Sequence, residues 1–350
     1  MAAESRRVRP SIFYLVVLPA LALAIVAGIV IGSTPLAWST VVRVLAMKLL
    51  PGLVDPAGLA PADVAIVWLI RLPRVLVAVV VGAGLATAGA IMQGLFRNPL
   101  AEPSLTGVGP GAVLGAVITF VTGWSTISVV TLPIAAIVAA LLSLFFVYAI
   151  STRGGATPIT TLLLAGIAVG SFLSAVSSLL LSLNIVTWQV AQDIVFWMMG
   201  GLDSRTWAHV WLSAPFVLLG FAAAILQTRT LDLLLLGEDS AAALGVDVEA
   251  AKRLLVFTAA LLTGASVAVA GMVGFVGLIV PHATRLLLGP SHRTLIPASA
   301  LGGATFLVCC DLLARTARPP VEIRLGVVTA LCGAPFFLFL LLRRLREAHE

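Results

Sequence analysis

Two arginines stand three residues apart at the head of a long apolar run, in the stretch WLIRLPRVLVAVVVG from Trp68 to Gly82. A third, Arg315, follows another apolar run. A guanidinium is planar and permanently charged, and it pairs with a carboxylate through two parallel hydrogen bonds. Arg71, Arg74 and Arg315 therefore suggest that charges displayed at a surface recognise an acidic protein partner. The alternative is that they anchor helix ends by extending their charged heads into water.

A second candidate is the polar stretch TRTLDLLLLGEDSAAALGVDVEAAKR, which runs from Thr228 to Arg253. Its residues Glu238, Asp239 and Ser240 favour the first turn of a short helix, and Gly245 can end that helix. The centre is too polar to cross a membrane, so we expect a helix displayed to another protein. The alternative is an amphipathic helix resting on lipid. Its acidic residues weaken that alternative, because the inner leaflet is anionic.

Small and hydroxyl residues gather in one apolar run. Its GIAVG segment, Gly166 to Gly170, is a small-xxx-small pair that permits close helix approach. Ser171, Ser174 and Ser178 fall at i, i+3 and i+7, so a helix places them on one face. These serines either line a hydrated path or bond to carbonyls of their own helix, and both interpretations stay open at this point.

Asp311 lies four residues before Arg315, a spacing at which acid and base on a helix can pair. A proton relay is the alternative, but no chain of acids or histidines continues from Asp311. We predict no catalytic residues, because the sequence has no H-E-x-x-H, G-x-S-x-G or G-K-[ST] motif. The three cysteines lack ligand spacing, so we also predict no metal site.

The elements that must position these residues are membrane helices. Hydrophobic residues make up 60% of the 350 residues and charged residues 10%, against about 25% charged in soluble domains. This composition predicts an all-α polytopic membrane protein with about ten transmembrane helices. The two apolar runs between Leu254 and Leu288 have only 35 residues between them, too few for two full spans and a turn. At least one of them must be short, with AGMVGFVG as a glycine-rich reversal buried in protein. The predicted helices are Ile12–Ile31, Val75–Leu95, Leu105–Val121, Ser128–Ile150, Ile159–Leu183, Ala208–Leu226, Leu254–Ala270, Met272–Leu288, Leu295–Leu313 and Ile323–Leu342.

Lysines and arginines divide unevenly between the two sides of a ten-span topology. The side with both termini carries thirteen and the other side eight, which accounts for all 21. By the positive-inside rule, both termini of this multi-pass protein lie on the cytoplasmic side of the inner membrane. The charges sit at helix ends and not on one solvated face, so we expect no nucleic-acid partner. The predicted organisation is a tail of residues 1–10, one transmembrane domain of residues 11–343 with a loop at about 228–253, and a tail of residues 344–350.

The order of several motifs resembles a known family. The run RLPRVLVAVVVGAGLATAGAIMQGLFRNPLAEPSLTGV is similar to the signature of ABC-importer permeases for iron-siderophore, haem and cobalamin, the FecCD or BtuC-like family. GEDSAAALGVDV, GFVGLIVPHATRLLLGPSHRTLIPASALGGA, DLLAR and EIRLGVVTALCGAPFF follow in the same order, from Arg71 to Arg343 overall. The resemblance implies a type II importer permease of ten helices. It further implies pairing as a dimer, binding to two cytoplasmic ATPases, and delivery of substrate by a periplasmic or lipoprotein-tethered binding protein.

The resemblance also implies roles for single residues. The positions of Arg71, Arg74 and Arg315 match those that meet glutamates of the binding protein. The loop after the sixth helix matches the coupling helices that enter a groove of the ATPase, through Gly237, Glu238, Asp239, Ala242, Leu244 and Gly245. The fifth helix lines the family's translocation path, which favours the hydrated-path interpretation of Gly166, Gly170, Ser171, Ser174 and Ser178. Arg324 stands where relatives usually have proline, so the start of the tenth helix is expected to differ.

The resulting hypothesis is the membrane-spanning permease of an ATP-driven importer that works by alternating access. We predict a ferric siderophore as its cargo, with haem or cobalamin as the alternatives. The chain is expected to bind no cofactor, because ATP-Mg is bound by the partner ATPase, and to work in the lipid bilayer as a homodimer or as a heterodimer with a homologous permease. The rival hypothesis is an ion-coupled secondary transporter, which needs ionisable residues at mid-membrane. The predicted helix centres are almost uncharged.

Overall fold

The computed structural model describes residues 8–32, 34–52, 58–183, 188–319 and 321–347, and within these ranges the regular structure consists of helices joined by turns and loops, with one isolated β-bridge. Seven helices are long and apolar enough to cross a membrane, and three shorter apolar helices accompany them. This confirms the predicted all-α polytopic fold, and seven plus three matches the ten expected spans. The long helices are α1 (Pro10–Val30), the rod Pro61–Leu95 that ends in α4 (Leu72–Leu95), α6 (Thr131–Ser151), α7 (Ile159–Leu183), α9 (Trp207–Leu226), α12 (Val248–Ala270) and α14 (His292–Thr316). The shorter ones are α5 (Val108–Val121), α13 (Val276–Leu288) and the Leu325–Phe339 part of α15 (Leu325–Glu347).

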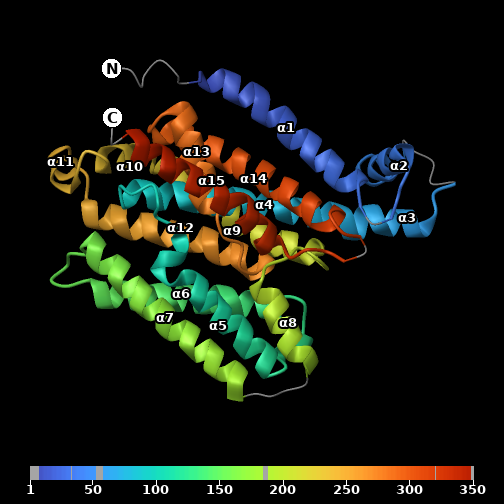
Figure 1. Ribbon diagram of the computed structural model, residues 1–350, viewed down its shortest axis with the longest axis horizontal. Coiled ribbons are helices and arrows are strands. Elements are labelled where there is room, and N and C mark those ends of the chain that lie inside the picture. Colours follow the sequence, from blue (N-terminus) through green and yellow to red (C-terminus); the bar gives the residue numbers. More distant parts are fainter. Residues whose placement is uncertain (1–7, 33, 53–57, 184–187, 320, 348–350) are drawn as a thin grey trace.

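Short helices cap the two ends of the bundle. Figure 1 places α10 (Thr228–Leu234) and α11 (Glu238–Ala243) at the end where α1 starts and α15 finishes. The start of α1 lies beside the end of α13, because the Val8 amide donates to the Leu287 carbonyl. The opposite end carries α2 (Trp38–Leu49) and α3 (Pro61–Ala65). In line with the orientation predicted from the lysines and arginines, we call the α10–α11 end the inner end and the α2–α3 end the outer end.

Several predicted boundaries need correction. The helices α2, α3 and α8 (Trp188–Met198) and the π-helical turn η2 (Ile66–Arg71) were not expected, because none is an apolar run long enough to span. The helix α15 begins at Leu325 and continues to Glu347, four residues into the predicted C-terminal tail. Residues 1–7 and 348–350 of the two predicted tails lie outside the described residues.

The central helix of the bundle is α4. In its most apolar window 78% of the residues are buried, and it packs against α9, α12, α13 and α14. Two glycines allow backbones to touch there: a Cβ on Gly82 would overlap the Gly303 carbonyl of α14, and one on Gly89 would overlap the Gly277 carbonyl of α13. Close approach of this kind is typical of membrane helices, which gain packing contacts but little hydrophobic energy from association.

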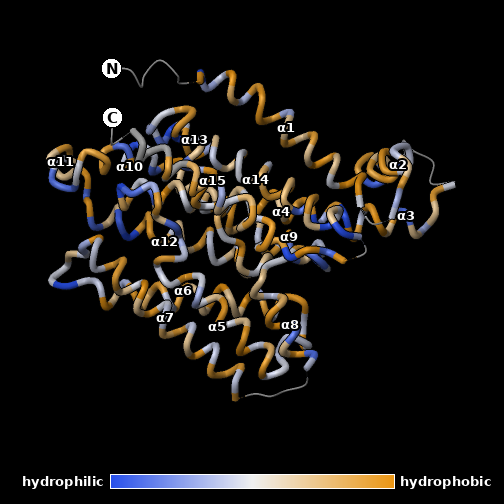
Figure 2. Tube along the Cα trace, in the orientation of Figure 1, coloured by the Kyte–Doolittle hydropathy of each residue, from blue (hydrophilic) through white to orange (hydrophobic). Residues whose placement is uncertain are grey.

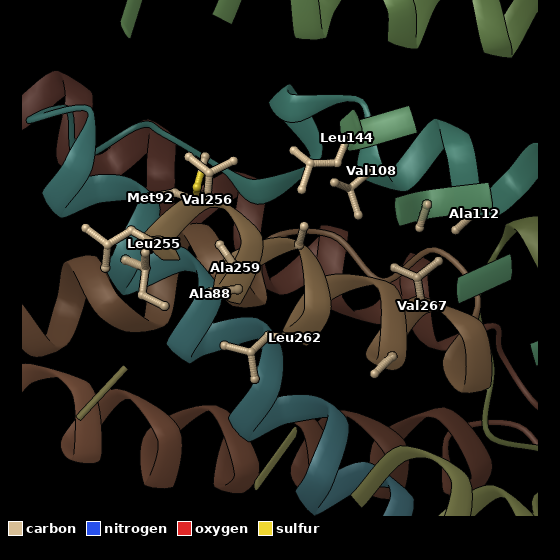
Figure 3. Packing of buried hydrophobic residues seen from close by; sticks show 14 of the residues in the cluster. Ala88, Met92, Val108, Ala112, Leu144, Leu255, Val256, Ala259, Leu262 and Val267 are labelled. Atoms are coloured by element: carbon tan, nitrogen blue, oxygen red, sulfur yellow. The ribbon is translucent and has the colours of Figure 1, made fainter. Parts of the chain in front are cut away.

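Two buried apolar clusters divide the length of α4 between them. The inner part of α4 belongs to a cluster with residues of α5, α6 and α12, and Met92, Val108 and Leu262 are among its buried side chains (Figure 3). The outer part of α4 belongs to a cluster with residues of α1, α2 and α14. The helix α1 is largely hydrophobic along its length, whereas hydrophilic residues gather around α10 and α11 and at the outer end (Figure 2).

The chain reverses inside the protein between α12 and α13. The helix α12 ends at Ala270, and α13 has 13 residues, so the prediction of one short helix after a glycine-rich reversal is confirmed. Backbone groups at the break find protein partners, as burial in a membrane requires. The Gly201 amide donates to the Ala270 carbonyl at 2.8 Å, and the Gln93 side-chain amide donates to the Leu278 carbonyl at 2.9 Å.

The contact between Gly89 and Gly277 predicts that Gly89→Ala lowers the melting temperature of the purified protein in detergent. Overpacking typically costs about 1–3 kcal/mol, and here the added methyl group meets a backbone carbonyl that has no rotamer to change. The control is Gly264→Ala, because a Cβ on this buried glycine of α12 would lie 3.4 Å from the Ala140 Cβ, an ordinary contact. Equal melting temperatures for Gly89→Ala and the wild type would contradict the close packing of α4.

Candidate functional site

The outer end holds a network of buried charges centred on Arg74. Its Nε donates to the Asp311 carboxylate at 2.9 Å, while its two terminal nitrogens donate to the two Glu322 oxygens at 3.0 and 2.9 Å. Arg74 is 9% exposed and Asp311 only 1%. The bidentate geometry is the strong form of this interaction. It ties α4 to α14 and to the segment that precedes α15.

Arg71 and Arg315 hold the outer end of α1. Arg71 donates to the carbonyls of Ile29 and Val30 at 3.0 and 2.6 Å, and Arg315 donates to the Gly28 carbonyl at 2.6 Å. The last carbonyls of a helix have no partner within it and carry partial negative charge, so cations stabilise that end. Arg315 also contacts Asp311 at 3.5 Å, which confirms the pair predicted from their four-residue spacing.

Three further charged residues complete this group. Arg324 pairs with Asp203 at 3.1 Å and lies 4.0 Å from the centroid of the Phe196 ring. Arg205 interacts electrostatically with both Asp203 and Arg74, and burial lowers the pKa of its guanidinium. We call the whole set the outer charge cluster. It has five arginines and three acids, a net charge of +2, and consists of Arg71, Arg74, Arg205, Arg315, Arg324, Asp203, Asp311 and Glu322.

The expectation that the three predicted docking arginines are displayed at the surface is wrong for the chain as described. Arg71, Arg74 and Arg315 are 4%, 9% and 5% exposed, and each has partners within the protein. The sequence could not show this, because the carbonyls of α1 and the Glu322 carboxylate come from distant segments. A docking role for these positions stays a prediction. The exposed arginine nearest to them in the sequence is Arg318.

At the inner end, the predicted short helix is present as α11. It starts at Glu238 after Gly237 with a φ of +109°, and Gly245 follows it with a φ of +86°. The helix rests on Lys252, whose ammonium contacts Glu238 at 3.0 Å and Glu249 at 2.5 Å. Beyond this base the helix and the residues after it are largely exposed, and the exposed residues are Asp239, Ser240, Ala242, Ala243, Leu244 and Gly245. Leu244 is 61% exposed, and Leu236 just before the helix is 64% exposed.

A pocket of about 460 Å³ opens beside α11. It lies between α11, the start of α12, the end of α4 and the start of α7, and its charged residues are Arg97, Glu238, Glu249 and Lys252. Lys252 also donates to the Thr157 carbonyl at 2.9 Å, so one buried ammonium joins α11, α12 and the turn before α7. In the sequence Lys252 is one of several charges in a loop. The signal that could have identified it is its position three residues after Glu249, a spacing at which the two side chains can pair on a helix.

The predicted path residues on α7 separate into two groups. Ser171, Ser174 and Ser178 are all exposed and share one side of the helix, as their spacing predicted. Gly166 and Gly170 are buried, so in this structure they do not lie on the exposed side with the serines. A Cβ on Gly166 would overlap the Leu105 carbonyl, and one on Gly170 would lie 3.3 Å from Pro110. These two glycines therefore let α7 pack closely against η3 (Pro103–Thr106) and α5 of the same chain.

Together, the all-helical multi-span fold, the charge networks at both ends and the exposed short helix on a fixed base describe a polytopic membrane protein with polar elements at its two ends. No group of three or more histidine, cysteine or acidic side chains that could hold a metal ion occurs in the part of the chain that the structure describes.

The chain belongs to the FecCD transport family, whose family model matches residues 20–343. It is 46% identical over 286 residues to the cobalamin import system permease protein BtuC of Halobacterium salinarum, which covers 81% of this chain and 75% of that protein. It is 42% identical over 282 residues to the hemin transport system permease protein HmuU of Yersinia pestis, with 79% and 84% covered. A solved structure described as an inward-facing metal-chelate type ABC transporter matches with a TM-score of 0.83 at 31% identity, with 96% and 100% covered.

The outer charge cluster predicts that Arg74→Ala destabilises the protein by about 3–5 kcal/mol, because it removes both hydrogen bonds to the buried Asp311 carboxylate and leaves it only the 3.5 Å contact with Arg315. Thermal unfolding in detergent measures this loss. The control is Arg318→Ala at the same end of the molecule, an exposed position where we expect a change within about 0.5 kcal/mol. If both variants unfold at the wild-type temperature, the network does not stabilise the fold.

Proposed function

We propose that this chain is the membrane-spanning subunit of an ATP-driven importer for a metal chelate. The observation that carries the proposal is the exposed tip of α11, where Ala242, Leu244 and Gly245 project from a helix whose base is fixed by Lys252. An exposed apolar tip on a fixed base has the form of a helix that enters a groove on a partner. Membership of a transport family makes an ATPase subunit the partner we assign to it.

In this proposal, the chain contributes conformational change and catalyses no reaction. Two copies, or this chain and a homologous permease, enclose a path in the lipid bilayer beside the serine face of α7. ATP-Mg is bound and hydrolysed by two separate cytoplasmic subunits, whose closure moves α11 and switches the side on which the path is open. The chain forms and breaks no covalent bond, and both of its termini lie in the cytoplasm.

The outer end is the proposed docking surface for a substrate-binding protein. The outer charge cluster has a net charge of +2, so the surface above it attracts acidic groups even though its arginines are internally paired. We keep Arg71, Arg74 and Arg315 in the proposal as docking positions, because their buried charges contribute to the positive potential at this surface. Arg318 is the exposed side chain that we add to them.

The proposed cargo is a large metal chelate, with a ferric siderophore as the first candidate and haem or cobalamin as the others. The matched permeases are named for cobalamin and hemin import, and the matched structure for a metal chelate. The exposed face of α7 offers hydroxyl groups and apolar side chains but no charge for a specific ligand. Selectivity is therefore assigned to the binding protein, and ligand binding by that protein is the direct way to identify the cargo.

Substitution of Leu244 tests the proposed ATPase contact. In the reconstituted transporter, Leu244→Asp is expected to weaken ATPase binding roughly 30-fold, the effect of losing about 2 kcal/mol at an interface hot spot, and to reduce uptake in proportion. Leu244→Met is the matched control, because it keeps the apolar character and volume. Full ATPase binding and uptake by Leu244→Asp would contradict the role of α11. Uptake that persists without any ATPase but stops when the proton gradient is removed would favour an ion-coupled transporter instead.

Reversal of an outer charge tests the docking surface. Arg318→Glu is expected to weaken docking of the binding protein at low salt, with a smaller difference from wild type at high salt, because exposed charges are screened over about 10 Å at 0.1 M. Arg229→Glu makes the same charge change at an exposed position of the inner end and serves as the control. Binding to the reconstituted permease measures the effect, and equal affinities for both variants would argue against docking at this end.

A further inference from the structure

The helix α10, which leads into α11, is attached to the body of the protein on its buried side. It packs against α4 and α14. Leu231 is fully buried and Leu234 is 4% exposed, so these two side chains fix one face of α10. A displacement of α11 can therefore reach the membrane helices by two routes, through Lys252 of α12 and through α10, which precedes α11 in the chain and is packed on the bundle.

One residue of α10 caps a different helix. The Asp232 carboxylate accepts the backbone amide of His292 at 2.8 Å and contacts its ring nitrogen Nδ1 at 2.7 Å, and the Ser291 hydroxyl donates to the other oxygen at 3.3 Å. His292 is the first residue of α14, and the side chain of the N-cap residue Ser291 makes no capping bond of its own. The start of α14 is thus capped by a residue 60 positions earlier.

His292 is held in place from several directions. It is fully buried, and a Cβ on Gly94 would overlap its Nε2, so the glycine at the end of α4 makes the space for this ring. Arg285 of α13 interacts electrostatically with both Asp232 and His292. Four helices, α4, α10, α13 and α14, therefore meet at the contact between Asp232 and His292.

We infer that the Asp232–His292 contact transmits the movement of α11 to α14, and that Asp232 and His292 are positioning residues for transport. This inference rests on the proposed function. The helix α14 has 25 residues, roughly 38 Å at 1.5 Å per residue, and its far end carries Asp311 and Arg315 of the outer charge cluster. A continuous helix held by charged contacts at both ends can carry a displacement from the ATPase side to the docking side.

The chain offers a matched control for simple helix capping. Asp247 caps α12 by accepting the Ala250 amide at 3.0 Å, and this donor lies only three residues after Asp247 in the sequence. Substitution of either aspartate removes one helix cap. Only substitution of Asp232 also disconnects two segments that are far apart in the sequence.

The experiment compares Asp232→Ala, Asp232→Asn and Asp247→Ala in the reconstituted transporter with its ATPase and binding protein. For Asp232→Ala we expect ATP hydrolysis to continue while substrate transported per ATP falls about fivefold or more, the lower end of typical coupling between sites. Asp247→Ala should leave this ratio unchanged. Asp232→Asn, which keeps an oxygen for the His292 amide, should restore most of it. A ratio for Asp232→Ala equal to that for Asp247→Ala would overturn the inference, as would the absence of any rescue by Asp232→Asn.

A measurement on the wild-type complex covers the case in which Asp232→Ala does not fold. Hydrogen exchange is compared between the nucleotide-free and ATP-trapped complexes. The inference requires residues 228–234 and 292–295 to change together, and a change confined to residues 228–234 would overturn it. Failure of the proposed function has a different signature, because the wild-type transporter would then show no ATP-dependent uptake at all.

Discussion

The structure depends on one constraint, which is that polar groups buried among membrane helices must find partners inside the protein. An unpaired backbone group in hydrocarbon costs several kcal/mol, and an unpaired charge costs more. The outer end shows the consequence, because Arg71 and Arg315 bond to the last carbonyls of α1 and thereby satisfy both the charges and the helix end. The Gln93 amide serves in the same way at the start of α13, deep in the bundle.

This constraint makes α4 and α14 the framework of the molecule. They touch through backbone at Gly82 and Gly303, and Arg74 of α4 pairs with Asp311 of α14 near the outer end. At the inner end, Gly94 of α4 leaves room for His292 of α14. The two helices are thus fixed to each other at both ends and in between. Peripheral elements attach to this pair through charged residues as well as apolar packing: Arg71 and Arg315 bond to the carbonyls of α1, and Asp232 of α10 bonds to His292.

Local pattern predicted much of this fold and little of its charge pairing. Runs of apolar residues predicted the ten spans, counting residues predicted that at least one helix of the pair between Leu254 and Leu288 is short, and i, i+4 spacing predicted the contact of Asp311 with Arg315. These features depend on neighbours in the sequence. Arg74 instead bonds to acids 237 and 248 residues away, and nothing local distinguishes such an arginine from one displayed at the surface. For the same reason Gly166 and Gly170 could be assigned to close packing but not to a side of α7, since the sequence does not say which neighbour approaches.

The exposed faces of α1 and α7 point to different surroundings for the two helices. Each has only 17% of its most apolar window buried, so both present most of their surface to something other than this chain. Beyond the first turn of α1, the exposed positions are apolar, and they include Leu15, Val16 and Leu23. The exposed side of α7 instead mixes leucine and phenylalanine with Ser171, Ser174 and Ser178. Lipid selects for apolar side chains, whereas contacts between membrane helices and hydrated paths favour small hydroxyl residues. The contrast supports placing lipid against α1 and a second permease chain with its path against α7.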